Sequence, residues 1–228
     1  MKIKSILLKA SVVGAAALLT YTLARRQQMR LSARGDELQR TRPGDEFIRD
    51  PRYQTTRAIT IDAPASEVWP WLVKMGQGRG GFYSYDWLEN LVGLDIHSAD
   101  TIIPDLQDLE VGDQVRLTPV DSRGPAFVME VAVLEPERSL VLRAPGTLEE
   151  ALEAGLPYAT WAFVLKPVSE SATRLIVRFR SDFKPTLRGL AFNKYALAVP
   201  HFLMERKTML GIKERAERSI KHGRGEVV

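Results

Sequence analysis

Two side chains near the C-terminus, His201 and Glu205, have types and a spacing that could support proton transfer. They are four residues apart, which places them on one face of a helix. If that face lines a cavity, the imidazole and the carboxylate can act as an acid/base pair. The sequence offers no third group to orient them, so we favour an ordinary pair on the protein surface.

A second pair, Asp86 and Glu89, lies on a predicted short helix over residues 86–91. Two carboxyl groups divide the roles of acid and base when their environments differ. One face of this helix is expected to be buried beside Trp87 and Leu88, which leaves the acids solvated. We therefore assign no catalytic residue.

Metal and nucleophile chemistry find little support in this sequence. The chain has three histidines and no cysteine, which excludes disulfides, thiolate zinc sites and a cysteine nucleophile. Asp95, His97 and Asp100 could bind a metal, but a capped loop explains their spacing as well. No Gly-x-Ser-x-Gly motif of a serine hydrolase occurs. We expect neither a metal nor a cofactor.

Residues 76–81 contain four glycines in six positions. Phosphate-binding glycine loops join a strand to the start of a helix, whereas this one follows a predicted helix. We interpret it as a turn that lets the chain pass close to its neighbours. The alternative is a mobile lip on which Arg79 meets a ligand carboxylate.

The composition excludes some classes of protein. The 228 residues are 45% hydrophobic and 26% charged, which suits one globular domain with additional terminal segments. The net charge is +6 over residues 1–52, −7 over 53–186 and +5 over 187–228. A nucleic-acid-binding protein concentrates positive charge on its folded face, but the predicted globular centre is acidic, so we expect no nucleic-acid partner.

The N-terminus carries an apolar run over residues 6–24, interrupted only by Lys9. As a helix it would extend about 28 Å, close to the thickness of a hydrocarbon core of about 30 Å. We interpret residues 1–26 as a single-pass membrane anchor. A signal peptide cleaved after residues 22–24 and a buried helix are the alternatives. Two arginines directly after the run favour a cytoplasmic domain.

The remaining chain predicts one domain. Residues 27–54 are rich in polar and turn-forming residues and indicate a linker. Alternating and helical apolar patterns then predict an order of a strand, two short helices, a run of strands and a long helix, at about 56–62, 66–73, 86–91, 115–179 and 201–220. Several strands have apolar residues on both faces, which suggests a curved sheet covered by the last helix.

Long stretches of this sequence resemble one family. They are residues 56–64, 67–72, 75–90, 95–100, 109–113 and 202–216, and the resemblance covers about residues 45–218. The family is the SRPBCC superfamily, which is START-like and related to polyketide cyclases. The resemblance implies an α+β helix-grip fold, in which a curved antiparallel sheet wraps around a long C-terminal helix and encloses an apolar cavity. We place this domain at residues 55–221, after a separate N-terminal apolar helix, and a tail at 222–228.

The family does not define the chemistry, because its fold serves carriers, receptors and cyclases. We expect the cavity to bind a hydrophobic or amphipathic small molecule, lipid-like or polyketide-like, near a membrane that residues 6–24 contact. The alternatives are a cyclase or dehydratase that uses the same cavity, and a non-catalytic interaction module with a filled interior. The candidate ligand-binding residues are Arg79, Phe82, Tyr83, Tyr85, Trp87, His97, Trp161, Phe163, His201 and Met204.

Overall fold

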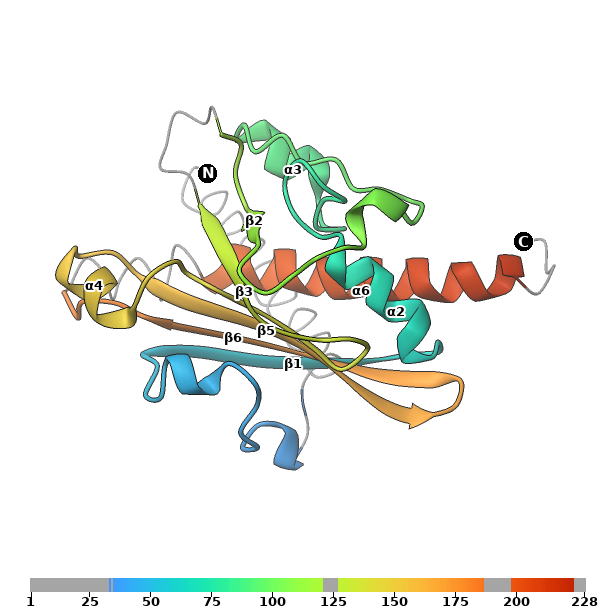
Figure 1. Ribbon diagram of the computed structural model, residues 1–228, viewed down its shortest axis with the longest axis horizontal. Helices are drawn as coiled ribbons and strands as arrows, with labels where there is room; N and C mark the ends of the chain where they lie inside the picture. The colour runs from blue at the N-terminus through green and yellow to red at the C-terminus, as the bar shows by residue number, and fades with distance from the viewer. Residues whose placement is uncertain (1–32, 34, 121–126, 187–197, 224–228) are drawn as a thin grey trace, which may run out of the picture. The chain divides into compact units, whose positions relative to one another are not determined.

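The computed structural model describes residues 33, 35–120, 127–186 and 198–223, which form an α+β fold (Figure 1). Six strands form one curved antiparallel sheet in the order β1-β6-β5-β4-β3-β2. The strands are β1 (Tyr53–Ile61), β2 (Gln114–Arg116), β3 (Val128–Glu135), β4 (Ser139–Arg143), β5 (Tyr158–Ser169) and β6 (Ala172–Asp182).

The helices follow the predicted order, except for one short helix, α4, that interrupts the predicted run of strands. The α-helices of the described residues are α2 (Ala65–Val73), α3 (Asp86–Leu91), α4 (Leu148–Glu153) and α6 (Ala198–Gly223). Short 3-10 helices lie at η1 (Gly35–Glu37), η2 (Asp45–Phe47) and η3 (Pro104–Leu106). The prediction of two short helices after the first strand and a long C-terminal helix is confirmed.

The long helix α6 crosses one face of the sheet (Figure 1). Met209, Ile212 and Ala216 are completely buried and recur at the spacing of one helix face. On β6, the alternate residues Leu175 and Val177 are also completely buried. The sheet, α2 and α6 therefore enclose the main core, in the helix-grip arrangement that the sequence predicts.

The opposite face of the sheet is covered by residues 35–50, which belong to the predicted linker 27–54. Every second residue of β6 on this face is charged or large: Arg174, Ile176, Arg178 and Arg180. Arg178 forms an ion pair with Asp45 at 2.6 Å and Arg174 forms one with Glu37 at 3.0 Å. Arg178 also donates to the carbonyl oxygens of residues 37, 38 and 40. This arginine row fixes the segment 35–50 to the sheet.

Some of the sequence predictions fall on residues that the structure does not describe. They are the whole predicted anchor at residues 1–26, the start of the linker at 27–32 and 34, the helical piece at 187–197 and the tail residues 224–228. Among the helices of the described ranges, none has the length and apolar character needed to cross a bilayer.

Candidate functional site

A pocket of about 160 Å³ lies between the sheet and α6. The helix contributes His201, Met204, Glu205 and Thr208, whose spacing of three and four residues directs them toward one side. The sheet and the preceding loops complete the lining with Phe82, Ser84, Glu89, Leu117 and Trp161. Four of these nine residues are apolar, and the other five bring two carboxyl groups, two hydroxyls and one imidazole.

Glu205 is buried, with 2% of its surface exposed. Its carboxylate forms an ion pair with Arg57 of β1 and accepts a hydrogen bond of 3.2 Å from the indole Nε1 of Trp161. A buried carboxylate is stable only when such partners replace water. The prediction that His201 and Glu205 form a surface pair is wrong, because this face of α6 turns toward the sheet.

His201 is held beside Glu205, with its Nε2 3.8 Å from the carboxylate Oε1. Its ring packs against Phe179, with the ring centroids 4.4 Å apart. Burial, together with the charge of Arg57, lowers the pKa of His201 to about 4. The imidazole is therefore neutral near pH 7, and its buried Nδ1 has no hydrogen-bond partner in the described part of the chain.

Glu89 brings the second carboxyl group to the pocket. Its Oε1 accepts a hydrogen bond of 2.7 Å from Ser84 Oγ, while its buried Oε2 has no partner among the described residues. Burial raises the pKa of Glu89, the charge of Asp86 acts in the same direction, and the Ser84 hydrogen bond opposes both. The expectation that both acids of α3 are solvated is wrong for Glu89, which is only 6% exposed.

Asp86 plays a different part from Glu89. Its carboxylate accepts hydrogen bonds from the backbone N–H and the hydroxyl of Ser98, at 2.7 and 2.6 Å. It thereby ties the start of α3 to the following loop. The two acids of this helix therefore have different environments, one structural and one at the pocket.

Four of the ten candidate residues from the sequence line the pocket: Phe82, Trp161, His201 and Met204. A fifth, Phe163, is completely buried beside Trp161, with ring centroids 4.8 Å apart. It supports the pocket wall without being part of the lining.

The other five candidates lie away from the pocket. Tyr83, Tyr85 and Trp87 line a neighbouring cleft beside α3, which shares only Ser84 with the pocket lining. The guanidinium of Arg79 donates to the carbonyl oxygens of Val73 and Leu106, at 3.2 and 3.1 Å. His97 is exposed and pairs with Asp95, 3.0 Å away. Among the described residues, no three His, Asp or Glu side chains are grouped to hold a metal ion.

The glycine loop before Phe82 is a tight turn. Gly76 and Gly81 exchange two backbone hydrogen bonds of 3.0 Å. A Cβ at Gly81 would lie 2.7 Å from the carbonyl oxygen of His97, so only glycine allows this approach. The turn agrees with our first interpretation and sets the direction in which the chain enters the pocket wall.

Five lining residues were not among the ligand-binding candidates: Ser84, Glu89, Leu117, Glu205 and Thr208. The sequence analysis weighed Glu89 and Glu205 as acid/base groups and set both aside. A signal existed for three of them. Glu205 and Thr208 continue the stripe of Met209, Ile212 and Ala216, so a polar residue within a buried stripe marked Glu205 as unusual. Glu89 stood out as half of an acidic pair, and nothing in the local sequence distinguished Ser84 and Leu117.

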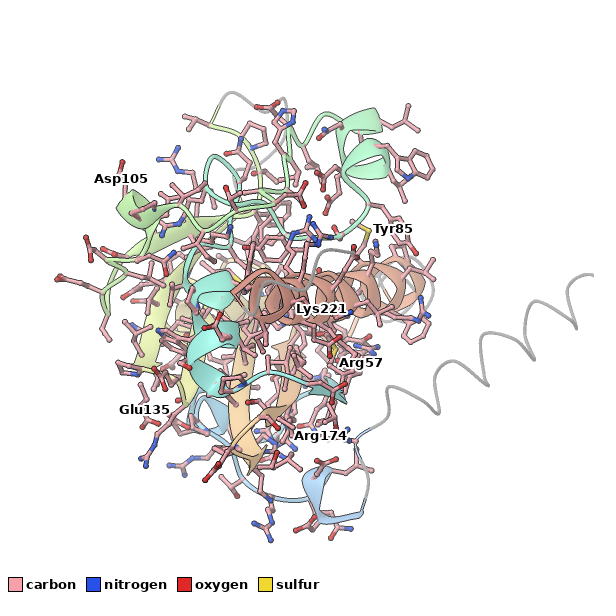
Figure 2. All side chains as sticks on the ribbon, turned by 90° about the vertical axis from the view of Figure 1, so that its right-hand side faces the viewer. Arg57, Tyr85, Asp105, Glu135, Arg174 and Lys221 are labelled. Atoms are coloured by element: carbon pink, nitrogen blue, oxygen red, sulfur yellow. The ribbon has the colours of Figure 1, made fainter. Side chains whose placement is uncertain are left out.

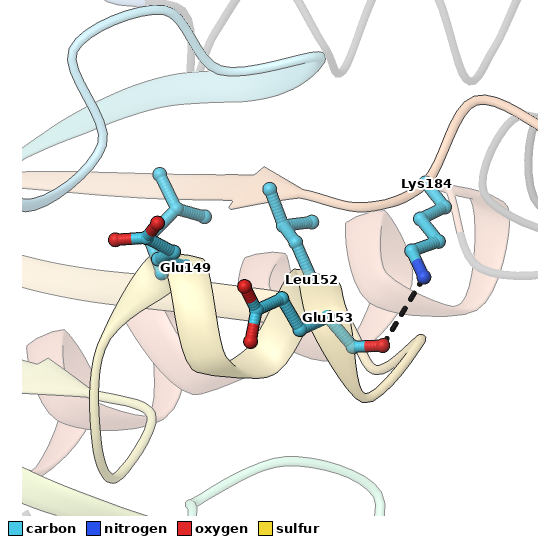
Figure 3. Close-up of a pocket in the computed structure, with 5 residues that line it drawn as sticks. Glu149, Leu152, Glu153 and Lys184 are labelled. Carbon is cyan, nitrogen blue, oxygen red and sulfur yellow. Dashed lines mark hydrogen bonds between the residues drawn. The ribbon is translucent and has the colours of Figure 1, made fainter.

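A larger hollow of about 480 Å³ lies on the surface between α4 and Lys184 (Figure 3). The Lys184 ammonium donates to the carbonyl oxygen of Glu153 at 3.1 Å. Glu149 and Glu153 are exposed there, and none of the lining residues is a buried polar group. The hollow therefore lacks the enclosed polar atoms that make the inner pocket a candidate site.

Comparison with known proteins adds only a fold likeness. No protein-family model and no curated protein matches the sequence. Among solved structures, truncated norcoclaurine synthase from Thalictrum flavum has 14% identity and a TM-score of 0.43, covering 71% of this chain and 91% of that one. A structure from Thermus thermophilus, TTHA0849, has 12% identity and a TM-score of 0.45, covering 73% and 99%. DynU16, from the dynemicin biosynthetic locus, has 18% identity and a TM-score of 0.37, covering 76% and 49%. Similarity at this level carries no argument about chemistry.

Proposed function

We propose that this protein is a helix-grip protein of the SRPBCC type that binds a small molecule between the sheet and α6. The observation that carries the proposal is a pocket lined by two residues that each have a buried polar atom without a partner in the described chain, Glu89 Oε2 and His201 Nδ1. Leaving such atoms unpaired costs about 1–3 kcal/mol each, which a ligand with matching groups recovers. The presence of the pocket also favours this function over an interaction module with a filled interior.

The size of the pocket limits the ligand. Its volume of about 160 Å³ is close to that of an engineered cavity of about 150 Å³ that binds benzene. We therefore infer that one ring or a short chain enters it, as the apolar end of an amphipathic molecule. Glu89 and Glu205 supply acceptors, so a hydroxyl or ammonium donor on the ligand is favoured over a carboxylate.

Ligand-observed NMR with benzylamine, benzyl alcohol and phenylacetate tests the proposal. We expect binding of the amine and the alcohol and weaker binding of the acid. Thr208→Phe fills the pocket and is expected to abolish binding, whereas Leu203→Phe, on the exposed side of the same helix, leaves it unchanged. Glu89→Gln preserves the shape and is expected to reduce the preference for the amine. Equal binding to the Thr208→Phe variant, checked by circular dichroism to be folded, would contradict the proposal.

The second candidate is an acid/base enzyme, such as a cyclase or dehydratase, acting in the same pocket. It is favoured by one observation: burial shifts the pKa of Glu89 upward and that of His201 downward, so the two groups hold opposite protonation states more readily than in water. A protonated Glu89 would donate a proton, and the neutral His201 would accept one.

Deuterium exchange separates catalysis from binding. Incubation of the protein in D₂O with a small aryl ketone, such as phenylacetone, is expected to accelerate exchange at the carbon beside the carbonyl. Glu89→Gln and His201→Gln should each slow it by at least about a hundredfold, the usual contribution of a general acid or base. If the wild-type protein catalyses exchange no faster than the double variant Glu89→Gln/His201→Gln does, the acid/base enzyme is rejected and binding remains the function.

We also propose that residues 6–24 anchor the domain to a membrane, on the basis of the sequence alone. Replacement of Leu18 and Leu19 by arginine places two charges in the apolar run, and we expect the protein to move from the membrane to the soluble fraction. Mass spectrometry of the mature chain tests the signal-peptide alternative, because cleavage near residue 24 removes the run.

A further inference from the structure

The surface of α3 exposes an unusual amount of apolar side chain. Trp87, Leu91 and Val92 are 70%, 75% and 70% exposed, and Leu88 beside them is 37% exposed. Four large apolar residues within six positions form what we call the α3 patch. A contiguous patch of this kind marks a binding surface more often than isolated apolar residues do.

A cleft of about 360 Å³ borders this patch and connects it to α6. Trp87 and Tyr85 line the cleft together with Lys207, Arg215 and Arg218 of α6. Figure 2 shows Tyr85 on the same side of α6 as α3, while Arg174, near the β5–β6 hairpin, lies on the opposite side. An aromatic and aliphatic patch thus adjoins basic side chains of a separate element.

The three acidic side chains of the cleft already have hydrogen-bond or ion-pair partners within the protein. Asp100 forms an ion pair with Arg215 at 2.8 Å, and Glu214 forms one with Arg218 at 2.6 Å. Asp86 accepts the two hydrogen bonds from Ser98. Lys207, in contrast, makes no hydrogen bond or ion pair with any residue that the structure describes. The cleft therefore offers a positive charge to an anionic group from outside.

We propose that the α3 patch and the cleft form a membrane-docking surface, in which the patch enters the lipid interface and Lys207 contacts a headgroup phosphate. Tryptophan and leucine are the side chains that interfaces favour, and lysine beside them binds anionic lipid. The cleft lining has three basic and three acidic residues, and both arginines are paired, so the charge that meets the headgroup is that of Lys207. The cleft adjoins the ligand pocket, with Ser84 lining both, but docking uses the outer residues of α3 and does not require the N-terminal anchor.

The absence of cysteine from the chain makes a direct test possible, because one introduced cysteine is labelled uniquely. The full chain is prepared with the environment-sensitive dye NBD at Leu91→Cys, at Val168→Cys as an exposed control on the β5–β6 hairpin, or at Val13→Cys in the N-terminal run. Each protein is mixed with phosphatidylcholine vesicles, with and without phosphatidylglycerol. We expect the emission at position 91 to rise and shift to the blue, and that at position 168 to stay constant.

The charge contribution is tested in the protein labelled at position 91. Lys207→Gln is expected to lower the ratio of docked to undocked protein about fivefold on anionic vesicles, as for one interfacial lysine. Lys166→Gln, an exposed lysine near the hairpin, should leave the ratio unchanged. An equal effect of the two variants would overturn the assignment of Lys207.

The remaining outcomes also decide the proposal. A change at position 13 without one at position 91 would overturn the α3 surface and leave the anchor intact. Changes at both 91 and 168 would mean unspecific adsorption, and no change anywhere would reject both membrane contacts. An emission at position 91 that is already blue-shifted without vesicles would show a protein contact, from this chain or a second copy, and would overturn docking to lipid.

Discussion

Arg57 on β1 and Glu205 on α6 form an ion pair where both side chains are almost excluded from solvent, at 11% and 1% exposed. The pair joins the edge strand of the sheet to the gripped helix. Trp161 of β5 binds the same carboxylate, so three elements meet at one buried charge. This junction supports the wall of the pocket and makes its integrity sensitive to single changes.

The first prediction concerns the energy of this ion pair. Arg57→Met or Glu205→Leu alone leaves an unpaired buried charge, and we expect a loss of about 3–5 kcal/mol in the free energy of unfolding. The double variant is expected to be much more stable than the sum of the two losses implies, because no charge is left unpaired. Urea denaturation of the four proteins measures this coupling.

The exposed ion pair between Glu214 and Arg218, on the same helix, provides the control for this double-mutant comparison. Glu214 and Arg218 are 58% and 42% exposed, and such pairs contribute at most about 1 kcal/mol. Additive losses from Arg57→Met and Glu205→Leu would show that the two residues act independently, and would contradict the buried pair.

The second prediction concerns acid sensitivity. His201 has a pKa of about 4 in the folded protein, against 6.5 for an ordinary histidine. Between these values the unfolded chain binds more protons than the folded one, so the free energy of unfolding falls as the pH decreases from about 6.5 to about 4. The loss from this residue amounts to about 3 kcal/mol in full.

Urea denaturation at several pH values tests this sign. His201→Phe keeps a ring against Phe179 and removes the titration, so its stability should depend less on pH over this range. Leu203→Phe introduces a ring on the exposed side of the same helix and should leave the dependence as in the wild type. A wild-type and a His201→Phe protein with parallel pH profiles would refute the assignment.

The third prediction concerns the segment over residues 35–50. Arg178 is 2% exposed and binds Asp45 and three backbone carbonyl oxygens. Arg178→Met leaves Asp45 without one of its two arginine partners, and we expect a loss of about 3 kcal/mol or more together with rapid proteolysis between residues 35 and 50. Arg218→Met removes an exposed pair with Glu214 on α6, across the sheet from this segment, and serves as the control. Equal protection of this segment in both variants would show that the arginine row does not hold it.

The sequence predicted the order of elements because strand and helix periodicities are local properties. The limits of α3 and the strong apolar pattern of α6 agree with the structure, and so does the alternation on β6. The covering of the outer face by residues 35–50 was not foreseen, because the partners of Glu37 and Asp45 lie more than a hundred residues away. The polar composition of residues 35–50 indicated a linker. In the structure, arginines of β6 bind these polar residues and hold the segment on the sheet.

The site was harder to predict than the fold. Aromatic residues after the glycine loop were expected to face one cavity, but the chain turns at Tyr83, whose φ is +57°, and sends Trp87 outward. The sequence also places Glu205 on a buried stripe, yet an acid at i+4 from a histidine is usually a surface pair. Whether Glu205 is buried or exposed depends on whether Arg57 lies opposite it, and this is determined by the tertiary structure, not by the local sequence.

The last prediction concerns Gly211 in the middle of α6. Replacing a helical glycine with alanine ordinarily stabilises a helix by about 1 kcal/mol. Here a Cβ would lie 2.4 Å from the carbonyl oxygen of Tyr83 and 2.6 Å from its Cβ, so α6 could not pack against the loop without displacement. We therefore expect Gly211→Ala to lower the free energy of unfolding by about 1–3 kcal/mol, as overpacked sites do. Ser219→Ala, farther along the same helix, creates no close approach and removes only the hydroxyl's hydrogen bond to the Arg215 carbonyl oxygen, so it should be nearly neutral. Stabilisation by Gly211→Ala in urea denaturation would show that the close approach of Tyr83 to α6 does not exist in solution.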